Sequence, residues 1–141
     1  MSQLIIRRRI LGRLLANVYT DIVVEYLSQR FNIPKAAVSI AYNNPILPGD
    51  IRPDLVIMYN NTWFIIEFKT KPNLLHDIDQ VIKYKQAIDT YIKPRRTIPI
   101  LAYVYRAPLE DLSIIEEKKI KPLVILHLIH GSYKILYEAL E

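Results

Sequence analysis

The first part of the chain repeats apolar residues at helical spacing. Between residues 4 and 31 they recur three, four or seven positions apart, which places side chains on one face of an α-helix. The set is Leu4, Leu11, Leu15, Val18, Ile22 and Tyr26. The pattern predicts a long amphipathic helix. It should end at Asn32-Ile33-Pro34, because the residue before a proline avoids helical angles.

The rest of the chain alternates between strand-like runs and helical stretches. Strands are predicted over residues 37–42, 53–59, 62–69, 98–106 and 122–129, helices over 74–92 and 109–119, and a strand or helix over 133–140. Asn60-Asn61 predicts a two-residue hairpin turn, since Asn tolerates positive φ better than most residues. Asn73 is expected to be the N-cap of the second helix. This order predicts one α/β domain over residues 1–141, a mixed central sheet flanked by helices.

Composition limits the classes of protein to which the chain can belong. Its 141 residues are 51% hydrophobic, which suits one folded core. The chain has no cysteine, so disulfides, cysteine-based zinc sites, iron–sulfur clusters and thiol catalysis are excluded. No apolar run reaches the ~18 residues that span a bilayer. Arginines interrupt the apolar start, unlike a signal peptide, so an intracellular protein without a membrane partner is expected. The net charge of +5 suits a polyanionic partner.

Charged residues stand at one end of the predicted hairpin. With a turn at residues 60 and 61, residue 59 pairs with 62, and Asp54 lies opposite Glu67. Side chains on a strand alternate between its faces, so Glu67 and Lys69 point the same way, ~7 Å apart. The sequence therefore predicts that two carboxylates and one ammonium group meet at the end of a two-stranded unit.

Two carboxylates so close together repel each other, and burial adds a desolvation cost. A divalent cation removes the difficulty, and Mg²⁺ or Mn²⁺ takes such oxygen ligands. The main-chain carbonyl of Phe68 could add a third oxygen. Lys69 could orient an attacking water molecule and offset charge on a phosphate. The ordinary alternative is a salt-bridged strand end, but strands this apolar should be buried, and buried charges are uncommon without a function.

These residues resemble a known superfamily. Pro53-Asp54, a gap of twelve residues and then Glu67-Phe68-Lys69 are similar to the motif of the PD-(D/E)xK nucleases, which have the restriction-endonuclease-like fold. The resemblance covers roughly residues 1–106 and implies an αβββαβ core with metal ligands on the hairpin. It also implies a Mg²⁺- or Mn²⁺-dependent deoxyribonuclease that leaves 5′-phosphate and 3′-hydroxyl ends.

The helix after Lys69 adds a second match. Gln80 and Tyr84 are four residues apart, hence on one helix face. They resemble the QxxxY motif of RecB-like nucleases, which implies that they hold the lysine and the DNA backbone beside the active site. A polar helix flank is the alternative interpretation.

The first helix offers a further acid. Val18, Ile22 and Glu25 follow the i, i+4, i+7 row, so Glu25 continues an apolar stripe. The family often has a metal-binding or orienting Glu on this helix, and the resemblance implies this role for Glu25. Asp21 and Asp50 are competing candidates, and Glu25 could also sit at the stripe's edge and reach solvent.

Basic residues are candidates for DNA phosphate contacts. They are Arg7, Arg8, Arg9 and Arg13 on the first helix, Lys71 and Lys83 near the predicted site, and Lys93, Arg95 and Arg96 after the second helix. A solvated helix face is the alternative. His76, His127 and His130 have no metal-like spacing, and Tyr103 and Tyr105 are expected in the core or an interface.

The function expected from these observations is a metal-dependent DNA nuclease, either an endonuclease or an exonuclease. A homodimer would resemble archaeal Holliday-junction resolvases of this size, whereas Gln80 and Tyr84 favour end-processing of single strands. A protein partner could also select the substrate. The alternative from another class is a non-catalytic nucleic-acid-binding or assembly subunit with the same fold. An enzyme acting on small acidic metabolites would need a deep pocket, which no motif indicates.

Overall fold

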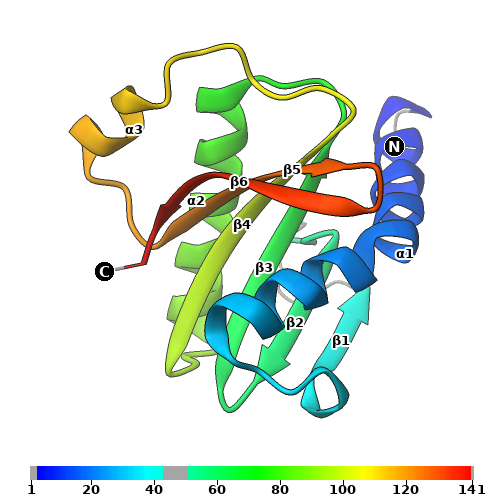
Figure 1. Ribbon diagram of the computed structural model, residues 1–141, viewed down its shortest axis with the longest axis vertical. Coiled ribbons are helices and arrows are strands. Elements are labelled where there is room, and N and C mark those ends of the chain that lie inside the picture. The colour runs from blue at the N-terminus through cyan, green and yellow to red at the C-terminus, as the bar shows by residue number, and fades with distance from the viewer. Residues whose placement is uncertain (1–2, 43–50, 141) are drawn as a thin grey trace.

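The computed structural model describes residues 3–42 and 51–140, with side chains described from residue 10 onward in the first range. The elements are α1 (Gln3–Phe31), the 3₁₀ helix η1 (Lys35–Ala37), β1 (Ser39–Tyr42), β2 (Leu55–Tyr59), β3 (Thr62–Lys69), α2 (Leu74–Tyr91), β4 (Arg96–Val104), α3 (Ser113–Lys118), β5 (Leu123–Ile129) and β6 (Ser132–Ala139). The strands form one sheet in the order β1-β2-β3-β4-β5-β6 (Figure 1). β4 is parallel to β3 and to β5, and the other neighbours are antiparallel. The prediction of a mixed sheet flanked by helices is confirmed.

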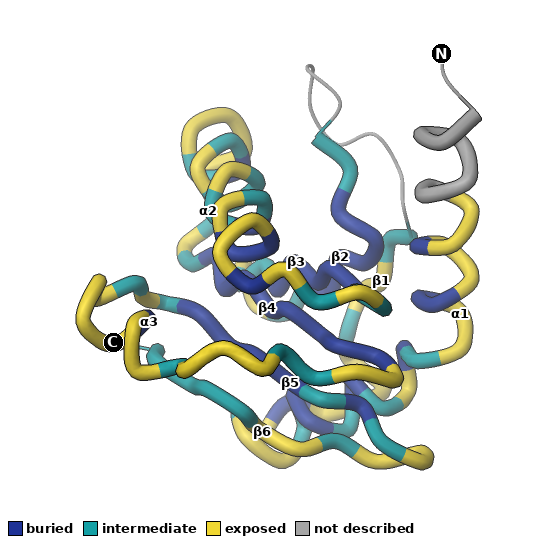
Figure 2. Tube along the Cα trace, turned by 90° about the horizontal axis from the view of Figure 1, so that it is seen from above, coloured by how far each residue is buried: buried dark blue, intermediate teal, exposed yellow. Residues whose placement is uncertain are grey.

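Helices cover both faces of this sheet. α1 packs on one face, where Leu15, Val23 and Leu27 join Phe64 and Ile66 of β3 in a buried cluster. α2 and α3 lie on the opposite face, where Leu74 and Ile78 of α2 pack with Ile115 of α3. The middle of the sheet is therefore buried between two layers, and the outer sides of the helices are exposed (Figure 2).

The hairpin of β2 and β3 has the register that its turn predicts. Tyr59 pairs with Thr62, and Leu55 pairs with Ile66. Asn60 and Asn61 have φ angles of 50° and 61°, the left-handed region in which Asn is among the few tolerated side chains. Odd-numbered residues of β3 face α2 and even-numbered ones face α1, so the predicted alternation of faces is confirmed.

The buried face of α1 differs from the predicted stripe. Its buried apolar side chains, among the described residues, are Leu15, Ala16, Val23, Val24, Tyr26 and Leu27. Val18 is 68% exposed and Leu11 is 44% exposed, so these two members of the predicted stripe point away from the core. α1 carries apolar residues around most of its circumference, and spacing alone therefore does not identify the side that packs on the sheet.

Other boundaries shift by a few residues, and the last segment is a strand. β4 covers Arg96–Val104 and α3 is restricted to Ser113–Lys118. The segment left open between strand and helix is β6, which pairs antiparallel with β5. The connection between the predicted strands 37–42 and 53–59 lies largely outside the described residues, which omit 43–50. Within the part of the chain that the structure describes, the helices are too short or too polar to cross a membrane.

Candidate functional site

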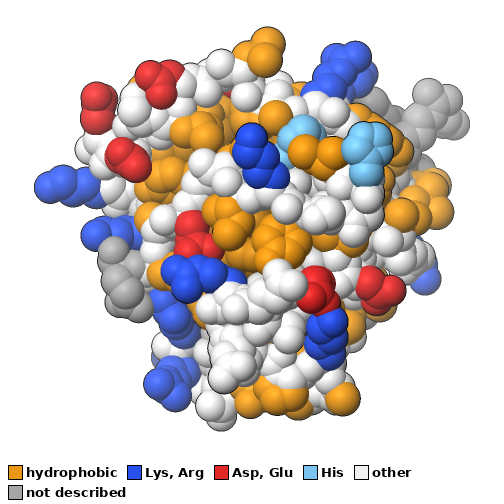
Figure 3. Space-filling model, viewed as in Figure 1, with side chains coloured by type: hydrophobic (Ala, Val, Ile, Leu, Met, Phe, Trp, Pro, Cys, Tyr) orange, Lys and Arg blue, Asp and Glu red, His pale blue; other side chains and the backbone are white. Residues whose placement is uncertain are grey.

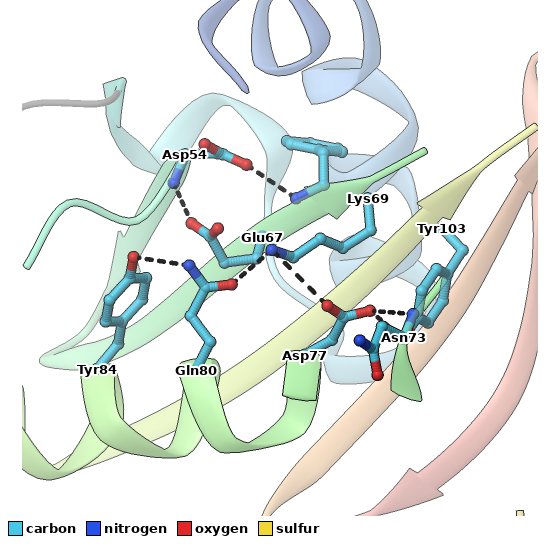
Figure 4. A network of polar contacts seen from close by, with 9 residues as sticks. Asp54, Glu67, Lys69, Asn73, Asp77, Gln80, Tyr84 and Tyr103 are labelled. Carbon is cyan, nitrogen blue, oxygen red and sulfur yellow. Dashed lines mark hydrogen bonds and ion pairs between the residues drawn. The ribbon is translucent and has the colours of Figure 1, made fainter. Parts of the chain in front are cut away.

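Two hydrogen bonds, each accepted by an acidic side chain, join the residue before β2 to the end of β3. The main-chain N–H of Asp54 donates to Oε1 of Glu67 at 2.7 Å, and the N–H of Phe68 donates to Oδ2 of Asp54 at 3.0 Å (Figure 4). Asp54 is 8% exposed and Glu67 is 5% exposed. Each carboxylate accepts one of these two hydrogen bonds with one oxygen, and its second oxygen accepts neither. The predicted meeting of two carboxylates at this end of the hairpin is therefore present.

Burial raises the pKa of both carboxylates. Burial raises the pKa of Asp54 to about 6, although the Phe68 N–H and the Lys69 ammonium group act in the opposite direction. Burial also raises the pKa of Glu67, and the neighbouring Asp54 carboxylate raises it further. The largest cause is the same for both, the loss of water around a charged carboxylate, and in Glu67 repulsion from a second negative charge adds to it. A cation between the two carboxylates would lower the cost of their charge.

Lys69 extends from the end of β3 to α2. Its Nζ donates to Oε1 of Gln80 at 2.5 Å, and Nε2 of Gln80 donates to the hydroxyl of Tyr84 at 3.1 Å. Because the amide NH₂ of Gln80 faces Tyr84, its oxygen faces the lysine. Figure 4 shows Tyr84 and Gln80 projecting from the helix and Lys69 reaching the Gln80 amide from the strand. The structure thus brings Gln80 and Tyr84 together with Lys69.

A third acid, Asp77, lies on the other side of Lys69. Its Oδ1 is 3.8 Å from Nζ of Lys69. Its Oδ2 accepts hydrogen bonds from the Asn73 N–H at 3.0 Å and from the Tyr103 hydroxyl at 2.9 Å. Asn73 is the N-cap of α2 as predicted, but its side chain makes no capping hydrogen bond, and Asp77 bonds back to its N–H. Asp77 is 2% exposed and belongs to the network around the two carboxylates.

α1 closes the site from the opposite face of the sheet. Gly12 lies against the side chain of Asp54, and a Cβ on Gly12 would stand 2.0 Å from Oδ1 of that residue. The helix can approach the carboxylate this closely only because Gly has no side chain.

The structure does not bring Glu25 to the pair of Asp54 and Glu67. Glu25 is bonded to Gln29 and ion-paired with Lys35. It is thirteen residues after Gly12, ~20 Å along α1 at 1.5 Å per residue. The prediction relied on the row of Val18, Ile22 and Glu25, of which Val18 is 68% exposed and Ile22 only partly buried. Asp21, its competitor, is exposed and ~13 Å along the helix from Gly12. Asp50 lies outside the described residues.

The predicted phosphate-binding residues are distributed over several places. Lys71 is exposed two residues beyond Lys69, and Lys83 is exposed on α2 beside Gln80. Arg95 and Arg96 lie at the opposite end of the sheet, because Thr62 pairs with Arg96 and Lys69 with Tyr103, ~23 Å further along β4. The predicted role of these two arginines in DNA binding is therefore separate from the carboxylate site.

The charge on the remaining surface is mixed. Figure 3 shows one face on which Lys and Arg side chains lie at several separate places among acidic and apolar ones. Arg13 is exposed on α1 next to Gly12. The side chains of Arg7, Arg8 and Arg9 are outside the described part, as is any contact they make. His76 is exposed and His127 is partly buried.

Three residues of the site did not follow from the sequence interpretation. Gly12 could have been noticed in the sequence, since it is a glycine inside a long predicted helix and the chain has only three glycines. Asp77 could also have been noticed, because it lies three residues before Gln80 and therefore on a similar face of α2. Tyr103 was expected in the core or an interface, and it is fully buried, but its hydroxyl also holds Asp77.

The donor set fits a hard divalent cation at its centre. Asp54 and Glu67 supply two adjacent carboxylates, and burial, which disfavours their charged forms, raises the pKa of both. Among the described residues, no cluster of three or more His, Cys, Asp and Glu side chains is arranged to hold a metal. A cation here would therefore depend on two protein carboxylates, a main-chain oxygen and water, which is the usual pattern for Mg²⁺.

Comparisons with known proteins show only distant similarity. No protein-family model and no curated protein sequence matches the chain. A protein of unknown function from Silicibacter pomeroyi is 13% identical with a TM-score of 0.43; the similarity covers 84% of this chain and 66% of that one, just under two thirds of its length. An XisH family protein from Nostoc punctiforme PCC 73102 is 14% identical with a TM-score of 0.48, over 82% of this chain and 96% of that one. Similarities this distant assign neither a family nor a function.

Proposed function

We propose that this protein is a divalent-metal-dependent deoxyribonuclease of the PD-(D/E)xK type. The sheet, with α1 on one face and α2 on the other, supports a restriction-endonuclease-like core. The order α1, β1, β2, β3, α2, β4 is the order αβββαβ that this core requires. The single observation that carries the proposal is the buried pair of Asp54 and Glu67, with Lys69 two residues further along the same strand.

A purely structural role explains this pair poorly. Removing charged groups from water costs several kcal/mol per ion in proteins, and two like charges add repulsion. Lys69 offsets part of that charge, yet its nearest acceptor is Gln80 on α2. A chain selected only for stability would place apolar residues here, as it does along the rest of both strands. The retained carboxylates support a site that binds a cation.

Asp54, Glu67 and the carbonyl of Phe68 would hold Mg²⁺ or Mn²⁺. When bound, the cation would polarise a phosphoryl oxygen and make a water molecule more acidic. Lys69 would orient the attacking water and stabilise negative charge on the phosphate. Gln80 and Tyr84 would keep the ammonium group in place, because the amide oxygen accepts from Lys69 while Tyr84 fixes the amide orientation.

The test is hydrolysis of DNA by the purified protein. Linear, circular, single-stranded and four-way DNA should be incubated with Mg²⁺, with Mn²⁺ and with EDTA. We expect cleavage only with the metal, and loss of about 10³-fold or more in Glu67→Ala and Lys69→Ala, the range for removing groups that act on the reacting phosphate. The matched control is Glu138→Gln, because Glu138 is a hydrogen-bonded, partly buried carboxylate paired with Arg30 elsewhere in the molecule.

Full activity in either alanine variant would end the mechanistic proposal. The same experiment separates the alternative of a non-catalytic DNA-binding subunit. Such a subunit would bind DNA with a steep salt dependence and would be indifferent to Mg²⁺ and to Asp54→Asn. Comparing circular with linear substrates decides between endonuclease and exonuclease, and the mass of the protein in solution tests the predicted homodimer.

A further inference from the structure

Asp77 is a buried carboxylate that the proposed chemistry does not use. One of its oxygens accepts two hydrogen bonds, from the Asn73 N–H and from the hydroxyl of Tyr103. The other lies 3.8 Å from the ammonium nitrogen of Lys69. The contact with Asn73 belongs to the start of α2. The orientation of the second oxygen toward Lys69 needs another explanation.

Lys69 is held from two positions on one side of α2. Asp77 and Gln80 are three residues apart, about one helical turn, and both present an oxygen to the same nitrogen. Each is fixed by an aromatic hydroxyl behind it: Tyr103 binds the acid and Tyr84 binds the amide. Figure 4 shows both contacts reaching the ammonium group from the helix. This arrangement directs Lys69 toward α2.

Without these acceptors, the ammonium group has an obvious alternative partner. Lys69 lies near enough to Asp54 and Glu67 to influence both carboxylates electrostatically. A lysine released from α2 would be drawn to the Glu67 carboxylate, since a buried ion pair at short range is strongly attractive. It would then occupy the oxygens that a divalent cation needs.

We propose that Asp77 is a positioning residue that holds Lys69 on the α2 side of the site, prevents it from pairing directly with Glu67, and so leaves the two carboxylates open to a metal ion. This inference rests on the proposed nuclease function for its biological meaning. The arrangement of Lys69 can nevertheless be tested without any nuclease assay.

The first test uses Asp77→Asn in the full chain. We expect its affinity for Mn²⁺, measured by calorimetry without DNA, to fall about 10-fold, as for other residues that orient a metal site from outside it. The cleavage rate kcat should fall about 10- to 100-fold while KM for DNA changes little. In a Lys69→Met background the same substitution should leave Mn²⁺ affinity unchanged, because no ammonium group is left to compete.

A crystal structure of Asp77→Asn gives a readout independent of activity. We expect Nζ of Lys69 within hydrogen-bond distance of the Glu67 carboxylate. Lys69 remaining on Gln80, or an undiminished loss of Mn²⁺ affinity in the Lys69→Met background, would overturn the inference. Wild-type protein that binds no Mn²⁺ and cuts no DNA would instead contradict the proposed function, and the lysine position would still decide the inference.

A milder pair of variants decides the question if Asp77→Asn does not fold. Tyr103 and Tyr26 are both fully buried, and each donates its hydroxyl proton to a carboxylate, at 2.9 Å to Asp77 and at 2.8 Å to Glu138. Tyr103→Phe should weaken Mn²⁺ binding about 2- to 10-fold, the worth of one hydrogen bond. Tyr26→Phe loses the same kind of bond on the opposite face of the sheet and should bind Mn²⁺ as wild type. Equal Mn²⁺ affinities of the two variants would overturn the inference.

Discussion

Gly12 of α1 touches the carboxylate of Asp54, so that even one methyl group on Gly12 would collide with Oδ1 at 2.0 Å. A glycine inside a helix costs ~1 kcal/mol relative to alanine. The chain accepts this cost at a point where the first helix meets the proposed metal site. α1 therefore shapes the site as well as covering the sheet.

Gly12→Ala should lower the free energy of unfolding, although alanine is the better helix former. The Asp54 side chain would have to leave its bond with the Phe68 N–H, and overpacking of this kind costs typically about 1–3 kcal/mol. Urea unfolding measures the loss, and calorimetry should show weaker Mn²⁺ binding. In an Asp54→Ala background the obstacle is gone, and Gly12→Ala should then stabilise by up to ~1 kcal/mol. Stabilisation in both backgrounds would contradict the close contact.

Glu67→Gln should make the metal-free protein more stable at neutral pH. The native pKa of Asp54, about 6, and the raised pKa of Glu67 lie above their unfolded values near 4. The native state therefore keeps protons that the unfolded chain has released, and stability falls as pH rises through this window. Gln keeps an oxygen for the Asp54 N–H and removes one charge.

The measurement is thermal unfolding in EDTA at several pH values. We expect Glu67→Gln to exceed wild type in Tm by roughly 3 °C or more at pH 8, and by little below pH 4, where both carboxylates are protonated. Excess Mg²⁺ should raise the Tm of wild type only, since a ligand that binds the native state stabilises it. A variant less stable than wild type at pH 8 would show that the two carboxylates do not destabilise the metal-free native state.

Tyr84→Phe should reduce DNA cleavage through Gln80. The phenylalanine ring fills the same space but no longer accepts the amide N–H, so the Gln80 oxygen is less firmly directed at Lys69. We expect a loss of about 2- to 10-fold in kcat. Gln80→Ala should cost more, and the double variant no more than Gln80→Ala alone, because the two residues act in series. Additive losses would mean that Tyr84 has its own contact with the substrate.

Glu25→Ala should leave DNA cleavage and Mn²⁺ affinity unchanged. Its partners are Lys35 and Gln29, and both charged side chains of the ion pair are more than a third exposed. Such pairs contribute about 0–1 kcal/mol, so only a small decrease in Tm is expected. A large loss of metal affinity would restore the sequence prediction and contradict the position of α1.

The hairpin turn can be tested by its backbone angles. Asn61 has a φ of 61°, which a β-branched side chain adopts only with strain. Asn61→Val should destabilise the fold by about 1–2 kcal/mol in urea unfolding, and Asn61→Gly should not. Equal losses would indicate a different turn.

The hairpin and the placement of its acids were predictable because they depend on local rules. Alternation along β3 and a two-residue turn at Asn60-Asn61 place Asp54 beside Glu67 whatever the rest of the chain does. The helical spacing of Gln80 and Tyr84 is likewise a local property. Their contact with Lys69 needed only that α2 returns over the strand from which the lysine projects.

The sequence by itself determined the succession of helices and strands as far as β5, the register of β2 with β3, and the grouping of two acids with one lysine. Only the tertiary structure decided which side of α1 packs on the sheet, and hence that Gly12 and not Glu25 meets the site. It also decided that Tyr103 of β4 reaches Asp77. The physical reason is that periodicity describes neighbours within one element, whereas contacts between elements depend on how whole apolar surfaces fit together.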